Sequence, residues 1–304
     1  MKDSIRNICE EWRVKTTTEE GFTYNSETAR YELHRHGIEP HLINFEELVC
    51  FGVEVSKNLL VGRLSSFETK DHKLFWLYAS SLISDYHPGN QSHLMRDDPE
   101  LFQLFNTCTS LLFMEHQPSA SMGNSTPQSF NPSLLASYMF FPLLETLSRR
   151  IASEYISEDG VVIKEFCVDG ISYLPTGKRK CSSLKHILHL AVSRVEPDSL
   201  RAGISELIQN LEKFSSDDKD GYAFLYELRN SALHAGVAVA TIGGYAASIA
   251  MLLGLNIYKD RFENSRKFIN ESIVYLRAQN FSPPCWFAIY AKNFSAQPRQ
   301  LGSD

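Results

Sequence analysis

Apolar residues recur every three to four positions along most of this chain, the spacing that is typical of amphipathic α-helices. In the first third of the chain, this spacing predicts helices over 45–51, 73–83 and 100–114. The last of these follows an Asp-Asp-Pro run at 97–99, which favours the start of a helix. No glycine-rich phosphate loop follows a strand in this region, so we do not expect a Rossmann-like nucleotide-binding domain.

The helical spacing continues through the second half of the chain. A helix is expected from Ser133 to about Ile156, with a kink at Pro142, because proline cannot donate the intrahelical hydrogen bond. Further helices are predicted over 183–195, 198–214, 221–235, an apolar segment that reaches Leu255 or beyond, and 261–277.

One short part of this half is predicted to be a β-hairpin. Two β-prone runs, 161–168 and 171–174, are separated by Asp169-Gly170. Asp-Gly between such runs is a strong hairpin signal. The predicted fold class is therefore mainly α, with one hairpin inserted in a helical bundle.

The segment from Ala235 to Tyr258 contains no charged residue and is long enough to span a bilayer. Its first half consists mostly of Ala, Gly, Thr and Val, and Asn256 lies near its far end. A helix that is apolar on all sides lies either in a protein core or in a membrane. We expect a buried helix, with a membrane span as the alternative. Its small residues at helical spacing favour a close approach of another helix, within the fold or across a dimer.

The segment 117–132 is rich in Pro, Ser, Gly and Asn and lacks apolar periodicity, as is typical of a linker. It suggests a helical N-terminal region of unknown role over 1–116 and a helical domain over 133–280. Residues 281–304 are expected to form a C-terminal tail.

Composition narrows the class of protein. Of the 304 residues, 43% are hydrophobic and 22% are charged, as in a soluble globular protein. The net charge of −6 argues against a general binder of polyanions, although a local basic site remains compatible with it. The six cysteines are scattered without a C-x-x-C pair, and the first residues lack the apolar run of a secretory signal. We expect a cytoplasmic protein.

The segment 228–236 has the sequence LRNSALHAG. Its polar residues are of types that can bind phosphate and transfer protons. Arg229 carries a permanent cation that matches phosphate, and His234 titrates near neutral pH and can transfer a proton. Asn230 offers a donor and an acceptor without adding charge. For RNA this set suffices, because the ribose 2′-OH is an internal nucleophile and the protein only has to deprotonate it and stabilise the phosphorane.

Helical geometry limits how these side chains meet. Successive residues turn by about 100°, so one apolar stripe should face the core. It consists of Leu225, Leu228, Ala232 and Ala235. Arg229 and His234 then lie about 140° apart around the helix. Either the helix ends near Ala235-Gly236, so that the imidazole can turn, or a second subunit completes the site.

The Arg, polar residue, three-residue spacer and His of this segment resemble the R-x4-H motif of the HEPN superfamily (higher eukaryotes and prokaryotes nucleotide-binding). Many HEPN members are metal-independent endoribonucleases, and their motif helix pairs with its copy across a homodimer. The resemblance implies that Arg229 stabilises phosphate charge, that His234 transfers a proton and that Asn230 occupies the polar position. It also implies an RNA substrate, no cofactor, and a role as a toxin or abortive-infection effector with a regulatory or antitoxin partner.

The resemblance extends loosely to Glu145, which is similar to an acidic residue in the first helix of many HEPN members. Glu227 shares the polar face of the motif helix and is a second candidate for support. The hairpin insertion departs from the family pattern, because a minimal HEPN domain carries a shorter connection there. The specific part of the resemblance is confined to six residues, 229–234.

Other interpretations of these residues stay open. The motif is also compatible with a helix C-terminus where Arg and His complement the dipole, with a non-catalytic module that binds a nucleotide or RNA, or with a structural adaptor. Lys178, Arg179 and Lys180 form a basic patch that suits an RNA backbone or a solvated loop. The histidines at 34, 36 and 41 lack further ligands at a convincing spacing, so we expect no metal site there.

Overall fold

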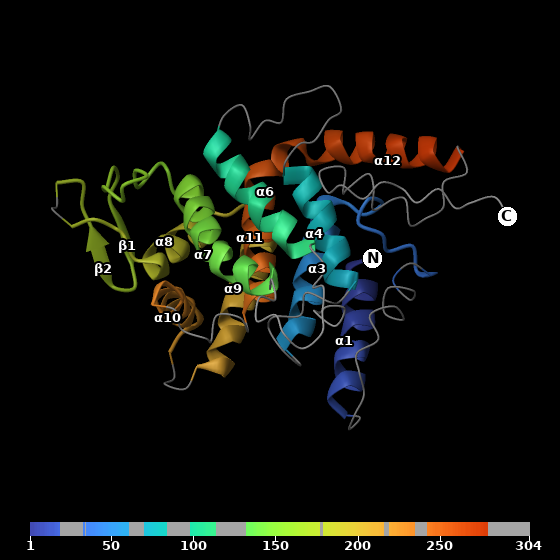
Figure 1. Cartoon of the computed structure of the whole chain (residues 1–304), viewed down its shortest axis with the longest axis horizontal. Coiled ribbons are helices and arrows are strands. Elements are labelled where there is room, and N and C mark those ends of the chain that lie inside the picture. The colour runs from blue at the N-terminus through green and yellow to red at the C-terminus, as the bar shows by residue number, and fades with distance from the viewer. Residues whose placement is uncertain are drawn as a thin grey trace, which may run out of the picture.

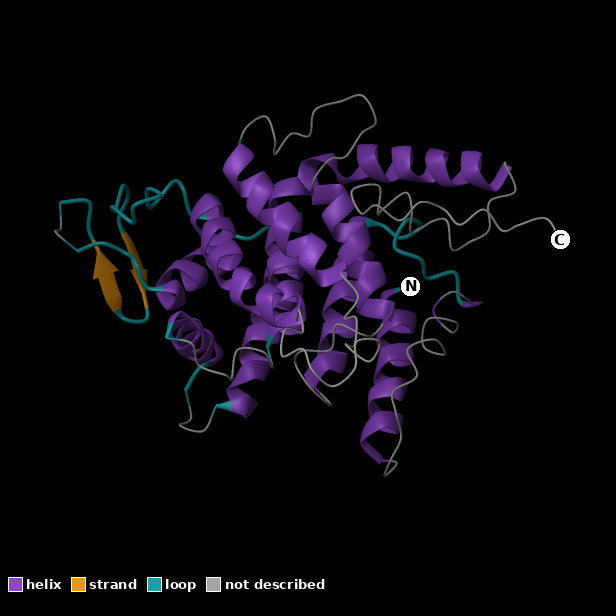
Figure 2. Cartoon of the chain, in the orientation of Figure 1, coloured by secondary structure: helices purple, strands orange, loops and turns teal. Residues whose placement is uncertain are grey.

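The computed structural model describes residues 1–18, 33, 35–60, 70–83, 98–113, 132–176, 179–215, 219–234 and 242–278. Within these residues the protein is mainly helical, and its single small sheet lies at one end of the molecule (Figure 2). The predicted fold class, mainly α, is confirmed at this level. The predicted linker 117–132 lies outside the described residues except for Pro132, and so does the tail 281–304.

The N-terminal part contains α1 (Lys2–Thr18), α3 (Phe45–Lys57), η1 (Asn58–Leu60), α4 (Lys70–Ile83) and α6 (Pro99–Phe113). The three helices predicted here, α3, α4 and α6, are present. Helix α1 was not predicted, because most of its residues are polar. Its apolar side is narrow and includes Ile5 and Cys9, both buried, which lie four residues apart. Helix α1 packs against α3, which covers this narrow apolar side.

The C-terminal part contains every element that the sequence predicts. These elements are α7 (Pro132–Ile151), β1 (Phe166–Val168), β2 (Ile171–Tyr173), α8 (Leu184–Ser193), α9 (Asp198–Asn210), η3 (Leu211–Phe214), α10 (Gly221–Leu233), α11 (Gly243–Tyr258), η5 (Lys259–Arg261) and α12 (Phe262–Ala278). Helix α7 contains Pro142 and ends five residues earlier than expected. The chain then turns, with an isolated bridge between Ile156 and Val162. For this reason strand β1 is shorter than the predicted run.

The hairpin is formed as its turn residues predict. Asp169 (φ 55°) and Gly170 (φ 71°) both have left-handed backbone conformations, as a two-residue type I′ turn requires. Phe166 pairs with Tyr173 and Val168 with Ile171. The rings of Phe166 and Tyr173 stack with centroids 4.8 Å apart. The hairpin thereby contributes a small second core beside α8.

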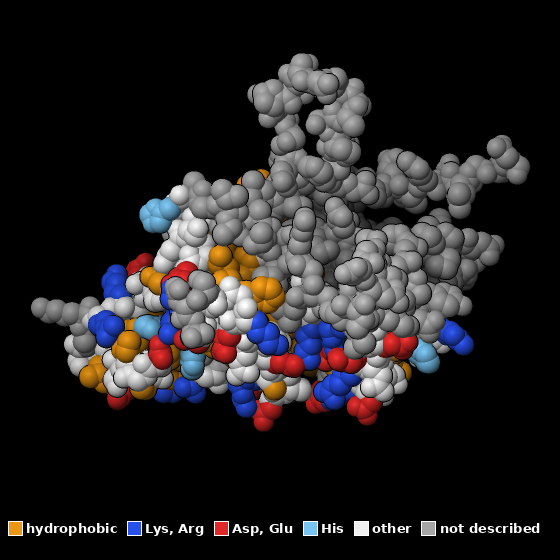
Figure 3. Space-filling view, turned by 90° about the horizontal axis from the view of Figure 1, so that it is seen from below, with side chains coloured by type: hydrophobic (Ala, Val, Ile, Leu, Met, Phe, Trp, Pro, Cys, Tyr) orange, Lys and Arg blue, Asp and Glu red, His pale blue; other side chains and the backbone are white. Residues whose placement is uncertain are grey.

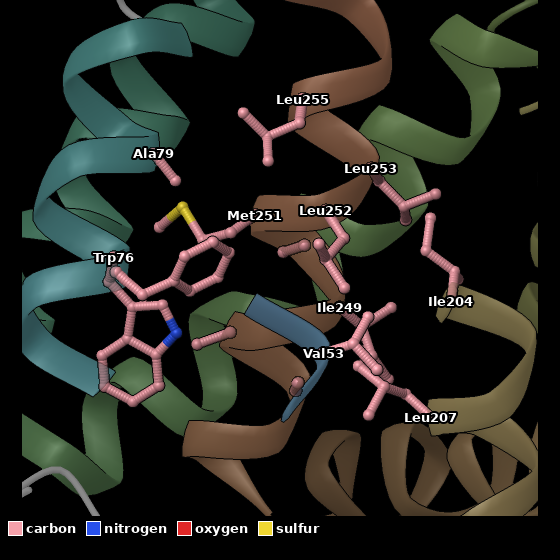
Figure 4. Close-up of a cluster of buried hydrophobic side chains, with 14 of the residues drawn as sticks. Val53, Trp76, Ala79, Ile204, Leu207, Ile249, Met251, Leu252, Leu253 and Leu255 are labelled. Carbon is pink, nitrogen blue, oxygen red and sulfur yellow. The ribbon is translucent and has the colours of Figure 1, made fainter. Parts of the chain in front are cut away.

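Helix α11 lies in the middle of the molecule and packs against α7, α4, α3 and α9 (Figure 1). All of its residues from Gly243 to Leu255 are buried. Trp76 of α4 donates a hydrogen bond from Nε1 to Ser248 Oγ at 3.1 Å, and Figure 4 shows Trp76 and Leu207 on either side of α11. The predicted buried helix is confirmed. Among the described residues, none of the helices combines the length and apolarity needed to cross a membrane.

The small residues of α11 permit a close approach within the fold. A Cβ atom at Gly254 would lie 2.6 Å from Cδ1 of Ile83 in α4. One continuous core thus includes α4 and α3 from the N-terminal part and α7, α9 and α11 from the C-terminal part. The two regions predicted from the sequence therefore do not have separate cores.

Candidate functional site

Helix α10 carries the Arg-Asn-His segment and is fixed at both ends. Asp220 caps the start, with its Oδ1 accepting a hydrogen bond of 2.7 Å from the amide of Ala223. The next residue, Gly221, lies so close to α9 that a Cβ there would be 1.8 Å from the carbonyl oxygen of Ile208. The helix ends at Leu233, and the amide of His234 bonds to the carbonyls of Asn230 and Ser231.

The two faces predicted for this helix are present. Leu225 is fully buried, and Leu228 and Ala232 are half-buried against the main core. Glu227 and His234 are exposed. The helix ends one residue before His234, close to the end predicted near Ala235-Gly236. This end is compatible with both predicted arrangements, an imidazole that turns and a site completed by a second subunit. Gly236 lies outside the described residues.

Arg229 is held by groups from two helices. Its Nη2 donates to Glu145 Oε2 of α7 at 3.3 Å, and its Nη1 donates to Asn230 Oδ1 at 3.2 Å. Glu145 Oε1 accepts a second hydrogen bond, of 2.9 Å, from Arg149 Nη2. The carboxylate of Glu145 therefore lies between two guanidinium groups, and the three side chains are only 28%, 21% and 16% exposed for Arg229, Glu145 and Arg149.

These three residues border a cleft of about 980 Å³ between α6, α7 and α10. Helix α7 supplies more lining residues than any other element, at helical spacing along one of its sides, and the turn after it, 153–159, supplies further ones. The cleft is lined by Asp98, Glu100, Leu101, Leu104, Tyr138, Phe141, Pro142, Glu145, Thr146, Arg149, Arg150, Ser153, Ile156, Ser157, Glu158, Asp159, Arg229 and Ala232.

Sequence reasoning missed two of the arginines in this cleft, Arg149 and Arg150. A signal was present for Arg149, because it follows Glu145 by four residues on a predicted helix, a spacing at which opposite charges meet. Nη1 of Arg149 is buried and has no hydrogen-bond partner in the part of the chain that the structure describes. A buried donor of this kind gains free energy when an acceptor reaches it.

His234 is not among the residues that line the cleft, although Arg229 is. Glu227 also lies apart from it and forms an ion pair of 2.6 Å with Lys219. Of the five residues proposed from the motif and its surroundings, the structure thus brings Arg229, Asn230 and Glu145 together. It does not bring His234 or Glu227 to the same place within one chain.

Two residues of the predicted basic patch, Arg179 and Lys180, are described, and neither is among the residues that line the cleft. Lys178 is outside the described residues, Lys180 is exposed, and the guanidinium of Arg179 lies 5.3 Å from the centroid of the Tyr173 ring. Tyr173 in turn forms a hydrogen bond of 2.7 Å with Nδ1 of His186. Burial, together with the charge of the adjacent Lys185, lowers the pKa of His186.

Charge is mixed across the molecule. In the cleft, Arg149, Arg150 and Arg229 share the walls with five carboxylates. On the face seen in Figure 3, Lys and Arg side chains alternate with Asp and Glu and do not form a continuous basic band. Within the described part of the chain there is no group of three or more His, Cys, Asp or Glu residues placed to hold a metal ion.

Comparison with known proteins adds no relative to this description. A scan against protein-family models, a search of curated proteins and a search of solved structures each gave no significant match to this chain.

Proposed function

We propose that the cleft binds RNA and that the protein is a metal-independent endoribonuclease of the HEPN type. The observation that carries the proposal is the position of Arg229, whose guanidinium is held by Glu145 and Asn230 at the edge of a cleft that also contains Arg149 and Arg150. Guanidinium groups present a planar set of donors that matches the oxygens of a phosphate. Three such groups suit one phosphodiester.

The chemistry needs only these groups and one proton carrier. The 2′-OH of the ribose loses its proton to an imidazole, and the 2′-oxygen forms a bond to phosphorus. Arg229 stabilises the added negative charge of the phosphorane. The bond from phosphorus to the 5′-oxygen then breaks, and that oxygen takes up a proton. The products are a 2′,3′-cyclic phosphate and a free 5′-hydroxyl.

His234 is the proposed proton carrier, and a second copy of the chain is proposed to supply it. Its imidazole is exposed at the end of α10 and does not line the cleft of its own chain. A homodimer that pairs the two α10 helices would bring the His234 of one copy to the Arg229 of the other. The same pairing is what the resemblance to HEPN ribonucleases implies.

The proposed biological role follows from the resemblance alone. HEPN ribonucleases often act as toxins or abortive-infection effectors, and we propose such a role in the cytoplasm for this protein. An antitoxin or another regulatory partner would then restrain the activity. Toxicity on expression that disappears in the Arg229→Ala variant would support this role.

The test of the proposed activity uses purified protein and an RNA labelled at its 5′ end, in excess chelator. We expect cleavage that leaves 2′,3′-cyclic phosphate ends, whereas a DNA of the same sequence stays intact because it has no 2′-OH. His234→Ala should lower the rate by about 10²- to 10⁴-fold, the usual contribution of acid–base catalysis. Cleavage that requires an added divalent metal, or a His234→Ala variant with the wild-type rate, would refute the proposal.

A non-catalytic module that binds a nucleotide or RNA is the second candidate. The observation that favours it is the separation of His234 from the cleft, because the described residues that line the cleft of a single chain include guanidinium groups and no imidazole. RNA binding that depends on Arg229, without any turnover by the dimer, would identify this function.

A further inference from the structure

The side chains that line the cleft change from apolar to charged along helix α7. Residues 138, 142, 145 and 149 of α7 follow one another at helical spacing and line the same cleft. Tyr138 and Pro142 come first along this side of α7 and the arginines follow, while Leu104 of α6 lines the same cleft. A rise of about 1.5 Å per residue puts Arg149 roughly 10 Å beyond Pro142 along the helix. The distance between the apolar end and the arginines is therefore about the length of one small ligand.

The apolar end is partly open. Tyr138 and Leu104 are half-buried and Pro142 is exposed, whereas Phe141 and Leu101 are almost fully buried beneath them. Pro142 has no amide hydrogen, so it cannot donate to the carbonyl of Tyr138 four residues earlier. This end of the cleft thus combines an aromatic ring, aliphatic surface and a carbonyl that lacks its usual helical donor.

Carboxylates also line the cleft that contains the arginines. Glu158 and Asp159, both exposed, and Asp98 and Glu100 at the start of α6 are among its lining residues, and the turn at Gly160 lies beside Arg149. Carboxylates repel phosphate groups, so a strand of successive phosphates is not favoured along this part. The charged centre is suited to one phosphate.

From this change from apolar to charged lining, we propose that the cleft binds a single nucleotide in one orientation. Its phosphate lies on Arg149, Arg150 and Arg229, and its base lies against Tyr138, Leu104 and Pro142. The inference rests on the proposed function for the phosphate site and adds the subsite for the base. Aromatic side chains stack on the face of any base, and a volume of about 980 Å³ is at the upper end of typical ligand pockets. On this proposal a longer RNA leaves the cleft on either side of this one nucleotide.

Calorimetric titration with three probes tests the subsite: adenosine 5′-monophosphate, ribose 5-phosphate, which lacks the base, and adenosine, which lacks the phosphate. We expect the nucleotide to bind at least about tenfold more tightly than ribose 5-phosphate, because stacking of one base contributes that much or more. Tyr138→Ala should remove most of this difference while leaving the affinity for ribose 5-phosphate unchanged. Leu104→Asn, on the other wall, should act in the same way if Tyr138→Ala does not fold.

Leu135→Ala is the matched control, because Leu135 is an exposed apolar side chain on α7 that does not line the cleft. Equal affinities for the nucleotide and ribose 5-phosphate would overturn the inference, even if the protein cleaves RNA. So would an unchanged nucleotide affinity in both Tyr138→Ala and Leu104→Asn. Discrimination between the two probes without RNA cleavage would support the subsite and count against the nuclease instead.

Discussion

Arg229 of α10 and Glu145 of α7 are 84 residues apart in the chain, and their side chains meet at 3.3 Å on the wall of one cleft. Glu145 also binds Arg149, so two cations share one anion. The guanidinium of Arg229 is thereby held in one orientation, and it shares the single negative charge of Glu145 with Arg149. This relationship determines the first predictions.

Arg229→Lys should lose about a hundredfold in the rate of RNA cleavage, because a point charge does not replace a planar fork of donors at a developing negative charge. Cleavage rates and circular dichroism of the purified variant check this. Arg201→Lys is the control, since Arg201 pairs with Asp198 at the surface of α9 and should leave the rate unchanged. A wild-type rate for Arg229→Lys would exclude a bidentate contact with phosphate.

Glu145→Gln should change binding and turnover in opposite directions. Loss of the carboxylate charge leaves more of the charge of Arg229 and Arg149 for phosphate, so RNA should bind about three- to tenfold more tightly. The same change weakens the ion pair that orients Arg229, so kcat should fall. Separate measurements of KM and kcat distinguish these effects. A parallel fall in affinity and turnover would show that Glu145 serves only to maintain the fold.

Mixed dimers test whether two chains share one site. Arg229→Ala and His234→Ala should each be inactive alone, but co-expressed chains should recover on the order of a quarter of the wild-type activity, because half of the dimers contain one intact Arg–His pair. Light scattering should show dimers in all three preparations. If Arg229 and His234 of the same chain acted together, the mixture would stay as inactive as either variant.

Gly221→Ala should destabilise the protein by about 1–3 kcal/mol, the usual cost of an overpacked site. Helix propensity predicts the opposite sign, because alanine is favoured over glycine in a helix. The added Cβ would lie 1.8 Å from the carbonyl oxygen of Ile208, which belongs to the backbone of α9 and cannot turn away. Chemical denaturation measures the change, with Ala223→Ser on the same helix as control. A variant as stable as wild type would contradict the close packing of α10 on α9.

His186 should make the stability of the fold depend on pH. Burial, and then the charge of Lys185, lowers the pKa of His186 below its ordinary value of 6.5. The unfolded chain therefore binds a proton more readily than the folded chain, so the contribution of His186 is complete above pH 6.5 and is lost as the pH falls towards the lower, folded pKa. Once His186 is protonated, its Nδ1 can only donate to the Tyr173 hydroxyl. Chemical denaturation at several pH values gives the free energy of unfolding as a function of pH. We expect this free energy to change less with pH in His186→Gln than in the wild type. An unchanged pH dependence would assign it to another group.

The sequence by itself determined those features that depend on neighbouring residues. The hairpin turn required only Asp169-Gly170, because this pair adopts left-handed conformations at little cost. The position and the core-facing side of α10 followed from the spacing of Leu225, Leu228 and Ala232. The burial of α11 followed from a long run without charge. In each case the information lies within a few turns of the same segment.

Only the tertiary structure decided which distant residues meet. The helical pattern identified Glu145 and Arg229 separately, but their contact depends on how α7 packs beside α10. Arg149 and Arg150 became part of the cleft for the same reason, and the narrow apolar side of α1 was recognisable only once α3 covered it. His234, chosen from its spacing to Arg229, does not line the cleft of its own chain, and its position lies about 140° from Arg229 around the helix axis. The spacing of residues along one helix determines where each side chain points around that helix axis. A site is formed by side chains from several helices, so it depends on how those helices pack against one another.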